Sequence, residues 1–114
     1  MNKNSNKITV EECINYPLQI PKNADIELKL EFKTNYENAY VYYKASDTGF
    51  HNSTDRAYIL NKGKVPIINN KASLWLLPVG VYKQHWNNYL YSKPHIHYRI
   101  CYVDSAGEEN ILFL

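Results

Sequence analysis

The stretch that decides the fold class runs Ile96-His97-Tyr98-Arg99-Ile100-Cys101-Tyr102-Val103-Asp104-Ser105-Ala106-Gly107. Successive side chains of a strand point to opposite faces. One face of this stretch therefore carries apolar and aromatic residues, namely Ile96, Tyr98, Ile100 and Tyr102. The opposite face carries His95, His97, Arg99 and Cys101. A turn over residues 104–107 and a returning strand over 111–114 predict a β-hairpin in an all-β protein.

The rest of the chain repeats this pattern of short strands and turns. Residues 26–33 alternate four apolar with four charged side chains, which is typical of a strand with one buried face. We also expect strands at 16–20, 39–45 and 72–77, a hairpin of 57–60 with 65–68 around 61–64, and a short strand at 89–91. In residues 39–45, Val41, Tyr43 and Ala45 are expected inward, and Tyr40, Tyr42 and Lys44 outward. Seven to nine short strands with turns every eight to twelve residues are typical of an antiparallel β-sandwich or a barrel, and we expect the sandwich.

We expect residues 1–7 to be a disordered tail and 8–114 a single β-sandwich domain. A set of apolar and aromatic side chains is expected to form its core. They are Ile26, Leu28, Leu30, Phe32, Val41, Tyr43, Trp75, Leu77, Tyr98, Ile100 and Tyr102.

Composition and charge narrow the class of function. The chain has 114 residues, 13 basic and 11 acidic, and a net charge of +2. Its lysines are scattered, whereas nucleic-acid-binding proteins carry a basic stripe. No apolar stretch is long enough for a signal peptide or a membrane span. We therefore expect no nucleic-acid partner, no membrane partner and a protein that is cytoplasmic when made.

The histidines are the candidate metal ligands of this chain. His95 and His97 lie two residues apart on a strand, so both imidazoles point to one side. His85, His51 or Cys101 could supply a third ligand. The cupin pattern is absent, because Cys101 and Tyr102 follow where that site needs a Glu. The ordinary interpretation is a pair of surface histidines on a solvated face. We therefore expect no cofactor, no metal and no enzymatic activity.

The aromatic surplus is the stronger indication of function. The chain has 11 Tyr and two Trp, and such side chains are enriched at binding surfaces. Trp86, Tyr89 and Tyr91 are expected in an irregular region, close to the amide side chain of Asn87. The candidate binding residues are Trp86, Asn87, Tyr89, Tyr91, Tyr40 and Tyr42. Ordinary cross-strand packing of these aromatics is the alternative.

The C-terminal hairpin, Tyr98 to Asn110, resembles the last hairpin of bacterial and phage immunoglobulin-like or fibronectin-type sandwiches. Leu77-Pro78-Val79-Gly80-Val81-Tyr82 is similar to a turn in the sandwich domains of phage baseplate and tail-fibre proteins. The resemblance implies a non-enzymatic scaffold or binding module with an immunoglobulin-like sandwich. Since Cys101 points away from the expected core face, a core disulfide with Cys13 is not expected.

These observations predict a structural or accessory binding module, associated with a phage or prophage virion, that acts through protein–protein contacts or self-association. One alternative is a carbohydrate-binding module that uses exposed aromatics. The other is a small metal-dependent enzyme with the His-x-His site.

Overall fold

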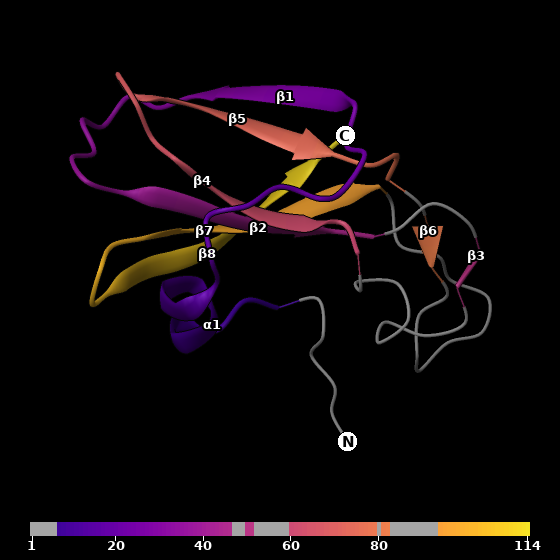
Figure 1. Cartoon of the computed structure of the whole chain (residues 1–114), viewed down its shortest axis with the longest axis horizontal. Coiled ribbons are helices and arrows are strands. Elements are labelled where there is room, and N and C mark those ends of the chain that lie inside the picture. Colours follow the sequence, from indigo (N-terminus) through magenta and orange to yellow (C-terminus); the bar gives the residue numbers. More distant parts are fainter. Residues whose placement is uncertain (1–6, 47–49, 52–59, 80, 83–93) are drawn as a thin grey trace.

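The chain builds two antiparallel sheets and one short helix, as a computed structural model shows (Figure 1). The structure describes residues 7–46, 50–51, 60–79, 81–82 and 94–114. Helix α1 spans Val10–Asn15, β1 Ile26–Glu31, β2 Tyr40–Ala45, β3 Phe50–His51 and β4 Lys62–Pro66. Strand β5 spans Lys71–Leu76, β6 Val81–Tyr82, β7 His95–Cys101 and β8 Ala106–Phe113. None of the described residues forms a helix able to span a membrane.

Six of these strands form the two antiparallel sheets. The larger sheet has the order β4-β2-β7-β8, and the smaller pairs β1 with β5. The expected hairpin between β7 and β8 is confirmed, with Tyr98 opposite Asn110 and Ile96 opposite Leu112. Two-residue strands β3 and β6 form a separate parallel pair, which the all-antiparallel prediction did not include.

The apolar core lies between the two sheets, which form successive layers in Figure 1. From the large sheet, the expected inward residues Val41, Tyr43 and Ala45 are fully buried. From the small sheet, Leu74 and Leu76 meet them. The main core prediction is therefore confirmed for β2.

The core prediction is wrong on β5 by one residue. Trp75 lies opposite Glu27, while Leu74 lies opposite Leu28, so the buried side chains are Leu74 and Leu76. Trp75 and Leu77 are only half-buried, and Ile26 is 41% exposed. A shift of one residue along a strand moves every side chain to the other face, which explains the errors at Trp75 and Leu77. Ile26 has the parity of Leu28 but lies at the start of β1. The remaining expected core residues are buried or half-buried around the same cluster, namely Leu28, Leu30, Phe32, Tyr98, Ile100 and Tyr102.

The turn between β4 and β5 forms at the asparagines that favour it. Asn69 and Asn70 both have positive φ, which Asn tolerates better than most residues, and Ile68 and Lys71 exchange two backbone hydrogen bonds across them. By contrast, the hairpin turn expected at 61–64 is wrong. Residues 62–64 lie inside β4, which pairs with β2. Gly63 is required by close approach, because a Cβ there would lie 2.6 Å from Tyr43 Oη.

The N-terminal segment also differs from the prediction. Instead of a strand at 16–20, one isolated bridge joins Gln19 to Lys64, and helix α1 precedes it. The side chain of Thr9 accepts a hydrogen bond from the backbone N–H of Glu12, so Thr9 caps the helix. A Thr followed three residues later by Glu is the sequence signature of such a helix start. Figure 1 shows α1 on the face of the large sheet that is opposite β1 and β5.

Candidate functional site

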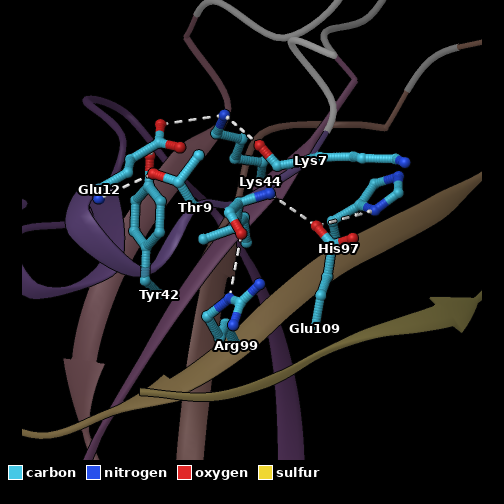
Figure 2. Close-up of polar contacts among 9 residues, drawn as sticks. Lys7, Thr9, Glu12, Tyr42, Lys44, His97, Arg99 and Glu109 are labelled. Atoms are coloured by element: carbon cyan, nitrogen blue, oxygen red, sulfur yellow. Dashed lines mark hydrogen bonds and ion pairs between the residues drawn. The ribbon is translucent and has the colours of Figure 1, made fainter. Parts of the chain in front are cut away.

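The outer face of the large sheet carries a buried polar cluster beneath the N-terminal segment. Side chains alternate between the two faces along β2 and β7. Tyr42 lies opposite Arg99 and Lys44 opposite His97, so all four share this face, with Glu109 beside Arg99 on β8. Residues 7–19, which we call the N-terminal strap, lie over them (Figure 2). The expected outward direction of Tyr42 and Lys44 is correct relative to the core, but both residues are buried.

Three cations hold the main chain of the strap. Lys44 Nζ donates to the carbonyl of Lys7 at 3.1 Å, and Arg99 Nε donates to that of Ile8 at 3.0 Å. Lys64 Nζ donates to the Ile14 carbonyl at 3.0 Å, where the last turn of α1 offers unsatisfied oxygens. Hydrogen bonds to charged groups are stronger than those between neutral groups, so these three contacts fix the path of the strap.

Glu12 completes the cluster from the strap side. Its carboxylate lies 3.0 Å from Lys44 Nζ and accepts a hydrogen bond from the Tyr42 hydroxyl at 2.9 Å. The ring of Tyr42 packs against Tyr16 at 4.7 Å between centroids. Burial, followed by the charge of Glu12, raises the pKa of Tyr42 well above its ordinary value. Tyr42 is therefore a neutral donor at all ordinary pH values, and it does not supply an exposed aromatic ring.

A disulfide joins the strap to the sheet. Cys13 of α1 and Cys101 of β7 are bonded, with Cα atoms 6.0 Å apart, and the described residues contain no free cysteine. The prediction that Cys13 and Cys101 do not pair is wrong. Its premise was correct, since Cys101 does point away from the apolar core. However, α1 covers that second face and brings Cys13 to it.

The two histidines lie in the same cluster and are not on a solvated face as expected. His95 and His97 are 6% and 3% exposed, and their Nε2 atoms lie 3.0 Å apart. His97 Nδ1 is 3.6 Å from Glu109, whose carboxylate also accepts the Ile8 backbone N–H at 2.7 Å. Burial, followed by the charges of His95, Lys44 and Lys7, lowers the pKa of His97 to about 4. His97 is therefore neutral near pH 7.

The polar groups of the cluster contact the chain's own backbone or one another. Its cations are directed at backbone carbonyls, and both cysteines are held in the disulfide. Within the described ranges, no group of three His, Cys, Asp or Glu side chains could hold a metal ion. His85 and the side chain of His51 lie outside the described residues.

Most of the predicted binding residues also lie outside the described part of the chain. These are Trp86, Asn87, Tyr89 and Tyr91. The structure separates the other two from that set. Tyr42 is buried under α1, and half-buried Tyr40 lies beneath Lys64, whose Nζ is 5.2 Å from the ring centroid.

The edge of the large sheet at β8 is an exposed surface that sequence reasoning did not single out. At the opposite edge, the Lys64 N–H of β4 donates to Gln19 of the strap. At the β8 edge, Leu114 N donates to Pro94 O, and the alternation of an antiparallel ladder then directs the N–H and C=O of Glu109, Ile111 and Phe113 away from β7. Three apolar side chains at this end are largely exposed: Ile111 at 49%, Phe113 at 63% and Leu114 at 58%.

A groove beside Trp75 is a second exposed feature. Trp75 lies on the outer face of the small sheet, opposite Glu27, which accepts a hydrogen bond from Ser73 at 2.6 Å. A hollow of about 380 Å³ adjoins the indole. Its lining is mixed, with Val65, Pro66, Ile68, Lys71, Ala72, Ser73 and Trp75.

Comparison of the chain with family models, with curated proteins and with solved structures finds no match.

Proposed function

We propose that this protein is a non-enzymatic structural or accessory binding module that acts through protein–protein contacts, with an immunoglobulin-like sandwich as its scaffold. The observation that carries the proposal is the β8 edge. An uncovered sheet edge offers a row of backbone donors and acceptors that can pair with another strand. Natural proteins usually guard such edges with Lys or Pro. Strand β8 contains neither. Its charges, Glu108 and Glu109, and its register shift against β7 lie toward its start, and its exposed end is apolar.

The buried cluster supports the non-enzymatic part of the proposal. A catalytic nucleophile needs an adjacent base and access to substrate. Here, the polar groups under the strap are engaged in holding the chain's own backbone. The resemblance of residues 77–82 to a turn in phage baseplate and tail-fibre domains supports a role as a virion-associated protein.

The disulfide bears on where such a module works. Disulfides persist in oxidising environments and are rare in the cytosol. The bond between Cys13 and Cys101 therefore argues against the cytoplasm as the final location. We propose that the protein is made in the cytoplasm, as expected from the sequence, and works in an oxidising environment, as a released virion component would.

The test is the molar mass in solution, measured by light scattering across a concentration series. We expect a mass above 13.4 kDa that returns to the monomer value in the Ile111→Lys variant, since a Lys on a strand edge opposes pairing. Circular dichroism would verify that the variant is folded. The proposal is overturned if the native protein stays monomeric at every concentration, or if Ile111→Lys associates as strongly as the native chain.

Carbohydrate binding is a second candidate function, which the groove beside Trp75 favours. A sugar ring can lie with its C–H face on an indole while its hydroxyls meet the polar side chains that line the groove, Lys71 and Ser73. We expect saturable binding on a glycan array that Trp75→Ala abolishes. The sequence favoured Trp86 instead, so Trp86→Ala is the matched variant. If both variants bind as the native protein does, this second candidate is eliminated.

A further inference from the structure

We propose that the partner at the β8 edge is a second copy of this chain, paired antiparallel through β8 about a two-fold axis at Ile111. This inference rests on the proposed function and names the partner and the register. The result would be one continuous eight-stranded sheet across the two copies.

The backbone chemistry of β8 is complementary to itself. The N–H and C=O groups of Glu109, Ile111 and Phe113 point away from β7, so they face a partner strand at alternate residues. In an antiparallel pair, two residues that face each other in this way exchange both hydrogen bonds. With Ile111 opposite its own copy, Glu109 lies opposite the second Phe113, and Phe113 opposite the second Glu109.

Charge and the number of hydrogen bonds together select this register. An axis at Leu112 or Phe113 would leave Glu109 beyond the end of the second strand, so fewer residues would exchange hydrogen bonds. If the axis lay at Glu109, two carboxylates would be directly opposite each other. If it lay at Asn110, the two Glu109 side chains would be diagonal neighbours, still within about 7–8 Å. Like charges at such positions are destabilising. An axis at Ile111 separates the two Glu109 residues by four positions along the strand, about 13 Å.

The side chains agree with that choice. Ile111 is 49% exposed in the single chain and would be covered by its own copy at the axis. Phe113 is 63% exposed and packs at 5.6 Å from His95, so its ring is held beside the edge. Glu109 is restrained by the Ile8 N–H and lies near His97. Its carboxylate is therefore directed toward the strap and not toward the second copy.

A cysteine introduced at the axis tests the register. The described part of the chain contains no free cysteine, because Cys13 and Cys101 are joined. Directly opposed residues in a hydrogen-bonded pair have Cα atoms about 5.5 Å apart, within the range that a disulfide spans. We therefore expect Ile111→Cys to form an intermolecular disulfide under mild oxidation, seen as a dimer on a non-reducing gel.

Glu108→Cys is the matched control on the same strand. In the proposed register, the two copies of residue 108 are six positions apart along the strand, about 20 Å, so they cannot join. Dimers from Ile111→Cys and none from Glu108→Cys would support the register. A native protein that associates and is disrupted by Ile111→Lys, but whose Ile111→Cys variant does not cross-link, would overturn this register and leave the proposed function standing. A monomeric native protein would overturn both.

Discussion

The two faces of the large sheet are both covered, but by different chemistry. The face toward β1 and β5 is sealed by apolar packing around Val41, Tyr43 and Leu74. The opposite face is mixed: a small apolar cluster around Ile8, Tyr42 and the disulfide lies beside the polar groups, and the strap is also held by three cation–carbonyl contacts. The comparison shows that strand alternation assigns residues to faces, but does not say whether a polar face meets water or another segment of the chain.

The apolar face is where a single substitution should cost the most. Leu74 is fully buried between the sheets, so Leu74→Ala removes packing and leaves a cavity. We expect a loss of about 2–5 kcal/mol in the free energy of unfolding, measured by denaturant titration. Leu18→Ala, at a residue that is 57% exposed, is the control and should change stability by less than about 0.5 kcal/mol. Equal losses in the two variants would contradict the assignment of the core.

On the polar face, the disulfide is expected to contribute most. It closes a loop with a sequence separation of 88, which restricts the unfolded chain. We expect Cys13→Ser combined with Cys101→Ser to lower the free energy of unfolding by about 2–4 kcal/mol. Hydrogen exchange should also become faster, and the increase should be larger in residues 7–19 than in β5, where it reflects only the global loss of stability. An increase in residues 7–19 no larger than that in β5 would contradict a bond that holds the strap.

The buried cation Lys44 should have a smaller effect. Lys44→Met leaves the Lys7 carbonyl without this donor. It leaves the Glu12 carboxylate with the Tyr42 hydroxyl but without its cation. Because the Glu12 side chain remains 30% exposed and can be hydrated, we expect a loss of about 1–3 kcal/mol. Lys29→Met, at an exposed position of β1, is the matched control and should be nearly neutral. A neutral effect of Lys44→Met would show that the cation does not hold the strap.

The most specific effect is a pH dependence from His97. Its pKa of about 4 in the folded protein lies below the ordinary value of 6.5, so the unfolded chain binds a proton first as the pH falls. The contribution of His97 to stability is constant above pH 6.5. Between about pH 6.5 and 4, the free energy of unfolding should fall by up to about 1.4 kcal/mol per pH unit.

The control for this pH dependence is His97→Asn, which removes the titrating group. Denaturant titrations of both proteins at a series of pH values would isolate the contribution of His97. We expect a shallower slope in the variant over that window. The same slope in both proteins would show that His97 does not remain neutral in the fold.

Much of the sheet could be predicted from the sequence, because its determinants are local. The hairpin of β7 and β8, the strand at β1 and the inward set of β2 all follow from alternation and turn residues. The Asn69-Asn70 turn is equally local. The error at Trp75 and Leu74 arose because residues 72–77 are almost continuously apolar, so alternation does not say which side chains face the core.

The polar cluster could not be predicted, because it depends on a contact between distant segments. Nothing near His97 or Arg99 in the sequence shows that residues 7–19 cover them. One local signal was available, since Thr9 and Glu12 have the spacing of a helix start. With a helix there, Cys13 could face the sheet, and the polar side of β7 becomes an interior surface.

The measurement that tests the account most directly is peptide mapping of the protein purified without reductant. The account predicts that the tryptic peptide with Cys13 is recovered joined to the peptide with Cys101, and that it is released on reduction. Recovery of both cysteines as free thiols that alkylate in the native protein would contradict it. In that case, the strap would not be bonded to the polar face of the sheet.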